Sequence, residues 1–572
     1  MDAGKRTINE VFNGSRILEV PFFQRAYVWE EPQWERFLED VESVCATRDT
    51  YFMGSLILKQ QMTVASDPVG DVRLVVDGQQ RMTTLSILLK VLSLKTGAQK
   101  KFEKRFMLDE DIGGPVLHHN HNDEEAYNRI MNLSSLEELE GNDGVTKVYH
   151  FFAKNADPQK LDFDTICNKI VFVGIDLNYD EDEQQIFDTI NSLGVRLTTA
   201  ELLKNYFFGR SDIEAYQKDW QAVFEKDEET RLYWDRTIST GRFTRTYIDL
   251  FFYSFLLIRI QDSRFNVSTE DKQQFSKVER LFESYKAFIK KYENGNKTDI
   301  LKEIREYAIV FRNAIAPDVL ERELPAEACI DRINAVMFAL DTATLIPYVL
   351  YLEKTVHDIN VRNDIYDYLE SYIMRRLVTR QTTKNYNQLF SERLILNQIQ
   401  TKKALAQTIM DKDATVNFMP SDGQVADAFH SSVLTNRYAA GVLYLIESKI
   451  RNRDRHATQL LGISKYSLEH LMPKKWRNNW QFEGADEEAI KRDQVLLTLG
   501  NLAIITQSLN ASIRDADWET KKAGKGTKGG LDKYADGIET LSEYLDEPVW
   551  DETKIRERAD RLANTALRVW MA

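Results

Sequence analysis

The stretch that decides the fold of the N-terminal region is Val72-Arg73-Leu74-Val75-Val76-Asp77-Gly78-Gln79-Gln80-Arg81-Met82-Thr83-Thr84-Leu85. Its first five residues are mostly apolar and β-branched, which is typical of a short buried strand. Gly78 permits a tight turn, and the apolar pattern of residues 82–95 predicts a helix that begins at about Gln79 to Arg81. Residues 51–59 and 170–175 are also strand-like, so we expect strands and helices to be mixed in this region.

This turn has the chemistry of an anion site. A helix that starts directly after a strand offers free backbone N–H groups and a partial positive charge. Arg81 can add a guanidinium fork for a phosphate, and Asp77 would hold a metal, a ribose hydroxyl or Arg25. The alternative is structural, because Asp-Gly is a common turn and Gln79 and Gln80 would then be first-turn surface residues.

Two further segments carry polar residues of the same kind. Residues 21–29 contain Gln24 and Arg25, and residues 187–205 begin in an expected acidic helix that carries Phe187 and Ile190. In the second of these segments Gly194 has the position of a helix C-cap, and Thr198 with Glu201 forms a capping box for the next helix. Helix capping does not explain the remaining four polar residues, namely Asn191, Arg196, Lys204 and Asn205.

The composition of the 572-residue chain, 43% hydrophobic and 29% charged, is that of a globular protein with two to four domains. Its three cysteines lie far apart, which excludes a disulfide framework and indicates a reducing compartment. With no long apolar run and no signal core, we expect a cytoplasmic protein without membrane contact. The net charge of −14 excludes a non-specific DNA coat, so any DNA contact must use local basic patches.

The remaining pattern predicts an α+β chain that is predominantly helical. Residues 105–145 are polar and look loop-rich, and residues 206–415 show long helical periodicities with clustered aromatics. We therefore expect three domains, which cover residues 1–210, 211–420 and 421–572.

The C-terminal region contains Glu469-His470, Gly500-Asn501-Leu502 and Asn510. Metal-assisted phosphodiester hydrolysis needs a base that activates water and a divalent ion that neutralises developing charge. His470 can supply the base, and Glu469 and Asn510 offer the oxygen ligands that Mg²⁺ prefers. The alternative is that His470 is an ordinary, partly buried strand residue.

Basic residues gather near this segment. Residues 451–480 hold seven basic and two acidic residues, a local balance of +5, and a flexible basic loop is expected around Lys521, Lys522, Lys525 and Lys528. A phosphate backbone could dock there, although a solvated charged surface is the alternative.

Taken together, these motifs resemble the GmrSD-type modification-dependent (type IV) restriction endonucleases, a group that includes BrxU and SspE-like enzymes. The N-terminal likeness rests on Gln24-Arg25, on Asp77 to Arg81, and on the segment from Phe187 to Asn205, and it covers about residues 5–210. The C-terminal likeness, to an HNH (ββα-metal) domain, rests on Glu469-His470, Asn501 and Asn510. The resemblance implies a ParB/sulfiredoxin-like N-terminal domain, a helical middle and a C-terminal HNH nuclease domain.

Position by position, the resemblance also implies the site residues. His470 would be the general base, Asn501 would orient it or its loop, and Glu469 and Asn510 would ligate Mg²⁺ or another divalent cation. Lys521 or Lys522 would be the lysine that family members carry beyond the last Asn. A nucleoside triphosphate (GTP, ATP, UTP or CTP) would contact Gln24, Arg25, Asp77, Gly78, Gln79, Gln80, Arg81, Asn191, Arg196, Lys204 and Asn205.

The expected function is an anti-phage, modification-dependent DNA endonuclease, a nickase or a double-strand cutter, regulated by nucleoside triphosphate binding or hydrolysis. Its expected partners are double-stranded DNA, in particular modified phage DNA, and the nucleotide; a homodimer is left open. The alternative is a nucleotide-dependent DNA-binding switch with a non-cleaving HNH domain, and a weaker one is a toxin that cuts host nucleic acid. The modification read, the preferred nucleotide and the sign of its effect on cleavage are left open.

Overall fold

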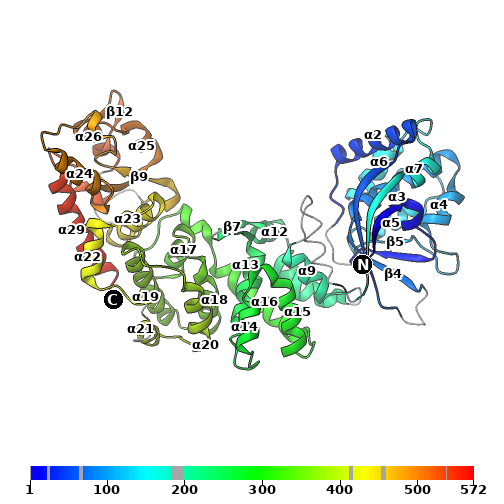
Figure 1. Ribbon diagram of the computed structural model, residues 1–572, viewed down its shortest axis with the longest axis horizontal. Coiled ribbons are helices and arrows are strands. Elements are labelled where there is room, and N and C mark those ends of the chain that lie inside the picture. Colours follow the sequence, from blue (N-terminus) through cyan, green and yellow to red (C-terminus); the bar gives the residue numbers. More distant parts are fainter. Residues whose placement is uncertain are drawn as a thin grey trace. The chain divides into compact units, whose positions relative to one another are not determined.

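The computed structural model divides the chain into two compact units, Met1–Trp220 and Gln221–Ala572 (Figure 1). It describes residues 2–21, 26–63, 69–179, 181, 198–209, 212–240, 243–410, 416–452, 459–535 and 537–572. The α+β class with a predominance of helix is confirmed.

The first unit is built on a six-stranded mixed sheet in the order β1-β6-β3-β4-β2-β5. β3 pairs in parallel with β6, and β2 pairs in parallel with β4 and β5, whereas the β1–β6 and β3–β4 pairs are antiparallel. The strands predicted at residues 51–59, 72–76 and 170–175 are all present. The strand bounds are β1 Asp2–Thr7, β2 Arg16–Glu19, β3 Tyr51–Gln60, β4 Asp71–Asp77, β5 Leu117–His118 and β6 Ile170–Leu177.

Helix α3 (Gln79–Thr96) is the centre of this unit, as the apolar pattern after Asp77 predicts. Its residues from Met82 to Ser93 are buried on every side, which is typical of a helix in the core rather than on the surface. Gly97 ends the helix in the left-handed conformation, with φ 71°. The other helices of the unit are α1 Ile8–Val11, α2 Glu31–Thr47, α4 Gln99–Phe106, α5 Glu124–Met131, α6 Gly144–Asn155, α7 Phe163–Lys169, α9 Thr199–Phe207 and α10 Ile213–Tyr216.

The expectation of loops at residues 105–145 is only partly correct. The segment contains strand β5 and helix α5, which buries Ala126, Tyr127, Ile130 and Met131. Those residues have helical spacing, but the polar residues between them hide the pattern. The acidic helix expected around Phe187 and Ile190 lies outside the described residues.

The second unit is mainly helical, as predicted for residues 206–415 (Figure 1). The helices of this part are α11 Ala222–Phe224, α12 Glu228–Asp235, α13 Tyr247–Arg259, α14 Thr269–Phe275, α15 Leu281–Tyr292, α16 Thr298–Ala314, α17 Ile330–Ala339, α18 Ile346–Thr355, α19 Ile359–Val378, α20 Leu394–Leu396 and α21 Lys402–Met410. A small hairpin, β7 (Thr237–Thr240) and β8 (Phe243–Thr246), lies between α12 and α13.

The C-terminal part of this unit contains two short hairpins among further helices. The strands are β9 Tyr466–His470 with β10 Leu502–Thr506, and β11 Gly524–Lys525 with β12 Lys528–Gly529. The helices are α22 Asp422–Ser431, α23 Asn436–Ile450, α24 Asp486–Val495, α25 Gln507–Ile513, α26 Trp518–Ala523, α27 Leu531–Tyr534, α28 Glu539–Ser542 and α29 Glu552–Val569.

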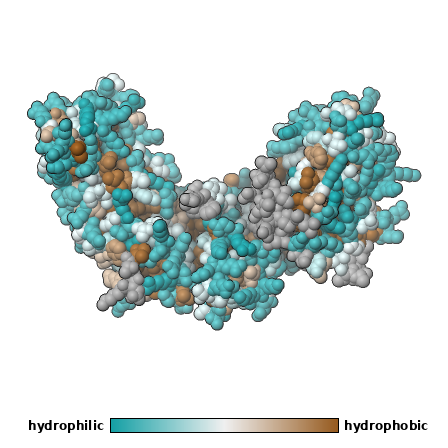
Figure 2. Space-filling view, in the orientation of Figure 1, coloured by the Kyte–Doolittle hydropathy of each residue, from teal (hydrophilic) through white to brown (hydrophobic). Residues whose placement is uncertain are grey.

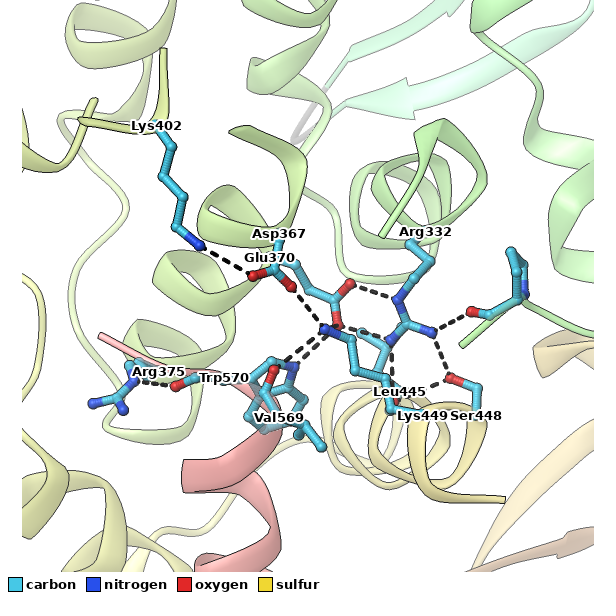
Figure 3. Close-up of polar contacts among 11 residues, drawn as sticks. Arg332, Asp367, Glu370, Arg375, Lys402, Leu445, Ser448, Lys449, Val569 and Trp570 are labelled. Atoms are coloured by element: carbon cyan, nitrogen blue, oxygen red, sulfur yellow. Dashed lines mark hydrogen bonds and ion pairs between the residues drawn. The ribbon is translucent and has the colours of Figure 1, made fainter. Parts of the chain in front are cut away.

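A buried polar network joins this part to the helical middle (Figure 3). Arg332 of α17 donates to both carboxylate oxygens of Glu370 of α19, over 2.7 and 2.8 Å, and the Trp570 indole N–H donates to the same carboxylate over 3.0 Å. Burial alone would raise the pKa of Glu370, but the Arg332 guanidinium holds it below its usual value. Arg375 donates to the backbone oxygen of Trp570 over 2.6 Å. The end of the chain is therefore anchored inside the helical middle, and the two parts share one core.

Hydrophilic residues dominate the visible face of each unit, with small apolar patches among them (Figure 2). Among the described residues, no helix is both long enough and apolar enough to span a bilayer.

Candidate active site

The β4–α3 turn holds Asp77 and Arg81 against strand β3. Arg81 Nη2 donates to Asp77 Oδ2 over 2.9 Å and to the Ser55 backbone oxygen over 2.6 Å. Gly78 has φ 107°, and a Cβ there would lie 2.8 Å from Leu56 Cδ1, so only glycine fits this turn. Arg81 Nε is buried and has no hydrogen-bond partner among the described residues, which leaves the guanidinium with an unused donor.

The first turn of α3 also binds the segment that follows Gln24 and Arg25. Gln80 Oε1 accepts from the Val28 N–H over 2.9 Å, and Asp123 Oδ2 accepts from the Tyr27 N–H over 2.7 Å. Gln24 and Arg25 themselves lie outside the described residues. Gln79 is only 6% exposed, so its interpretation as a first-turn surface residue is wrong.

A buried histidine against helix α3 was not predicted from the sequence. The His119 Nε2 atom is 3.1 Å from the Thr83 Oγ1 atom of helix α3. Complete burial lowers the pKa of His119 to about 3, so the ring is neutral. The signal was present in the sequence only as a histidine-rich polar stretch, with nothing to indicate burial.

The third N-terminal segment is described only in part. The capping box of α9 is confirmed, with the Glu201 N–H donating to Thr198 Oγ1 over 3.2 Å. Lys204 and Asn205 lie on α9, where Lys204 is buried. Asn191 and Arg196 lie outside the described residues.

In the C-terminal part, strands β9 and β10 form an antiparallel hairpin that helix α25 follows directly. His470, the last residue of β9, is in register with Leu502, the first residue of β10. Asn510 of α25 donates through Nδ2 to the Leu468 backbone oxygen over 2.9 Å and to Ser467 Oγ over 3.1 Å. The structure therefore brings His470 and Asn510 to the same short strand.

His470 is partly exposed rather than sealed in the core. Burial lowers its pKa to about 4, and the nearby Lys474 and Lys521 ammonium groups act in the same direction. Because a neutral imidazole is favoured above that pH, the ring can accept a proton under neutral conditions.

Asn501 is fully buried and uses both ends of its amide. Its Oδ1 accepts from the Met472 N–H over 2.8 Å and from the Trp550 indole over 3.0 Å. Its Nδ2 donates to the backbone oxygens of Met472 and Leu496 over 2.8 and 3.0 Å. Asn501 therefore fixes the chain that leaves His470, and no part of its amide is left to contact a substrate.

Glu469 is also buried, and its carboxylate forms an ion pair with Lys521 of α26, which is fully buried. The same ammonium donates to the His470 backbone oxygen over 2.8 Å. Burial raises the pKa of Glu469 and lowers that of Lys521, in each case against the attraction of the partner. Lys521, not Lys522, is thus the lysine of this site.

This pairing decides how well the site fits a divalent cation. The oxygens of Glu469 and Asn510 are of the type that Mg²⁺ prefers, but the Lys521 ammonium already neutralises the Glu469 carboxylate. Among the described residues, no three His, Cys, Asp or Glu side chains gather as a metal-binding group. While Lys521 forms this ion pair, the Glu469 carboxylate does not fit the role of a direct metal ligand.

The basic surface around the hairpin is smaller than the charge count indicates. Arg477 pairs with Asp493 over 2.9 Å, Lys465 pairs with Glu321, and Arg451 pairs with Glu447 over 3.6 Å. Lys474 and Lys475 are exposed beside His470, and Arg453 and Arg455 lie outside the described residues.

The expected flexible loop of lysines is wrong in its first part, because Lys521 and Lys522 belong to helix α26. Lys525 and Lys528 are exposed and face each other across the short β11–β12 hairpin.

These features define a protein of two units. The first has a strand–turn–helix, β4–α3, with the chemistry of an anion site, and the second has a hairpin followed by a helix, β9–β10–α25, with a neutral histidine. Residues 8–208 match the family described as the GmrSD restriction endonuclease, N-terminal domain, and residues 419–565 match the GmrSD restriction endonucleases, C-terminal domain. The chain belongs to the GmrSD restriction endonuclease family, which confirms the predicted resemblance. No curated protein matches the chain.

Proposed function

We propose that this chain is a modification-dependent DNA endonuclease that cuts invading phage DNA and is regulated by a nucleoside triphosphate in its N-terminal domain. Membership of a restriction endonuclease family supports the nuclease activity. The observation that carries the proposal is the position of His470, which is neutral, partly exposed and held at the end of β9.

In the proposed reaction, His470 accepts a proton from a water molecule that attacks the phosphorus of a phosphodiester bond. The bond from phosphorus to one sugar oxygen breaks, and this leaving oxygen takes up a proton from solvent water. Lys474, which is exposed and close enough to lower the pKa of His470, would hold a phosphate oxygen by charge attraction. Asn501 would keep the imidazole in place because it binds the Met472 backbone, two residues after His470. Because Lys521 occupies the Glu469 carboxylate, no step here uses a divalent cation.

The test compares His470→Ala with wild type in cleavage of plasmid and of matched modified and unmodified phage DNA. Mg²⁺ and each of the four nucleoside triphosphates are supplied in turn. A general base contributes roughly 10²–10⁴-fold, so the variant should lose that much cleavage. His430→Ala is the matched control, because His430 is a half-exposed histidine on α22 that pairs with Asp560 over 2.8 Å. Equal DNA cleavage by the wild type and by His470→Ala would contradict the proposed role of His470.

The second candidate is a nucleotide-dependent DNA-binding switch with a non-cleaving HNH domain. The Glu469–Lys521 ion pair favours it, since the expected metal ligand is already paired. A Mg²⁺ site at Glu469 and Asn510 would require Lys521 to release the carboxylate. Absence of cleavage by the wild type with every nucleotide and modified substrate, together with nucleotide-dependent DNA binding, would establish this function instead.

Nucleotide regulation is tested separately at the β4–α3 turn. Arg81→Ala removes a guanidinium with an unused donor from the proposed phosphate site, and should weaken nucleotide binding at least about tenfold. Arg36→Ala, an exposed arginine on α2, is the control. Unchanged nucleotide dependence of DNA cleavage in Arg81→Ala would contradict the regulatory role of this turn.

A further inference from the structure

A second polar site lies in the C-terminal part, away from the residues discussed so far. Helix α29, helix α28 and the end of α23 enclose a cavity of about 200 Å³. Its wall includes three arginines of α29, namely Arg558, Arg561 and Arg568. Their spacing, with Thr565 between the last two, places them along one face of the helix. Glu539 is the one acidic residue on the wall.

Arg558 is the unusual member of this group. It is fully buried, and its Nε and Nη1 donate only to backbone oxygens, those of Thr540 over 2.9 Å, Gly500 over 2.8 Å, Leu502 over 2.7 Å and Leu499 over 3.4 Å. Its Nη2 has no hydrogen-bond acceptor among the described residues. A buried guanidinium is normally paired with a carboxylate, because the cost of removing its charge from water is otherwise large.

Glu447, whose charge acts on Arg558, is not its hydrogen-bond partner. Glu447 influences the pKa of Arg558 but accepts hydrogen bonds from the backbone N–H groups of Glu539 and Thr540, each over 2.9 Å. It also lies 3.6 Å from Arg451. The charge of Glu447 is therefore already engaged, and an anion in the cavity would supply what Arg558 lacks.

The size and charge of the cavity define the class of ligand. Of the three arginines, Arg561 already forms an ion pair with Glu543, whereas Arg558 and Arg568 have no carboxylate partner among the described residues. These two guanidinium groups favour an anion, and a tetrahedral phosphate offers oxygens to more than one arginine fork at once. Pockets for drug-sized ligands occupy roughly 300–1,000 Å³, so this smaller cavity fits a single phosphate group better than a whole nucleotide. We propose that the cavity is a phosphate-binding site, occupied by inorganic phosphate, by the terminal phosphate of a nucleotide or by a phosphate of the DNA backbone.

The experiment uses the full-length chain and follows its thermal unfolding while inorganic phosphate is added at constant ionic strength. A ligand that binds the native state raises the unfolding temperature saturably. We expect this in the wild type, and an apparent dissociation constant about tenfold higher in Arg568→Gln, which loses a charge-assisted contact. Arg568 is exposed, so its replacement leaves the fold intact. Arg556→Gln, an exposed arginine of α29 outside the cavity, is the matched control and should behave as the wild type.

Parallel titrations with a nucleoside triphosphate and with a short DNA duplex identify the source of the phosphate. The source is the ligand whose shift in unfolding temperature saturates at the lowest concentration. They are made in an Arg81→Ala background, so that binding at the N-terminal turn does not contribute. A response that depends on Arg568 with any of the three ligands supports the proposal. The proposal fails if none of them gives a saturable shift, or if Arg568→Gln and Arg556→Gln respond alike. Neither outcome depends on whether the protein cleaves DNA.

Discussion

The β4–α3 turn and the β9–β10–α25 hairpin–helix represent two ways of building a polar site. In the turn, Asp77, Gly78 and Arg81 are close in sequence and contact one another directly, with Ser55 as their neighbour on β3. In the hairpin–helix, the contacts join residues far apart in the chain: Lys521 binds the His470 backbone oxygen, and the Trp550 indole binds Asn501. The first site is a local motif, and the second exists only when the whole unit is folded.

The two sites also differ in what their charges do. The Arg81 side chain is 24% exposed, so a ligand can reach it although it pairs with Asp77. The Lys521 side chain is fully buried and bound to Glu469, so its charge serves the protein itself. Substitutions should therefore change binding in the first site and stability in the second.

The largest expected effect is that of Asn501→Ala on stability. The substitution leaves the Met472 N–H, the Trp550 indole and two backbone oxygens without partners in the core. We expect a loss of about 3–5 kcal/mol in the free energy of unfolding, measured by urea denaturation. Asn510→Ala, which removes two bonds at a less buried position, should cost about 1 kcal/mol. Equal costs for the two variants would contradict the distinction between a buried clamp and a partly exposed site residue.

The next effect concerns the buried ion pair. Lys521→Met leaves the Glu469 carboxylate buried and uncompensated, and should cost about 3 kcal/mol or more in the free energy of unfolding. The double variant Lys521→Met/Glu469→Gln should recover a large part of this loss, because it removes the stranded charge. Lys522→Met, whose ammonium donates to the Glu547 backbone oxygen over 2.8 Å, is the matched control and should cost less than about 1 kcal/mol. A double variant no more stable than the single one would show that the pair is not coupled.

The smallest effect is a pH dependence in the first unit. His119 has a folded pKa of about 3, below its ordinary value of 6.5, so the unfolded chain binds a proton that the folded chain does not. Its contribution to stability is complete above pH 6.5 and is lost as the pH falls toward 3, at about 1.4 kcal/mol per pH unit. Between pH 6.5 and 4.5 the first unit should lose about 2 kcal/mol, as followed by denaturant unfolding.

His119→Gln should remove this part of the pH dependence. His150→Gln, at a half-buried histidine of α6 bonded to the Leu139 backbone oxygen over 2.8 Å, should keep it. The same slope in both variants would exclude His119 as the source.

Much of the first site could be predicted, because its signals are local. Apolar β-branched residues before Asp77, a glycine at the turn and an apolar run after Arg81 predicted β4, the turn and α3. The spacing of Thr198 and Glu201 likewise predicted the start of α9. The burial of Gln79 and the histidine behind α3 were not predicted, because the packing of distant segments decides them.

Less of the second site could be predicted. The motif around His470 predicted a candidate site on this strand, but it did not show that Asn501 uses both ends of its amide to bind Met472, Leu496 and Trp550. Nor could a run of four lysines show that the first is buried while the last two are exposed. Helix α26 turns Lys521 toward Glu469, and that contact joins residues far apart in the chain.

The sequence by itself determined the class of fold, the strand–turn–helix at Asp77 and the family to which the chain belongs, since these depend on residue types at short spacing. The tertiary structure alone decided that Lys521 neutralises Glu469, and that Arg558 is buried with one donor unused. The physical reason is that the state of a charge depends on its solvent exposure and its partner, and long-range packing sets both.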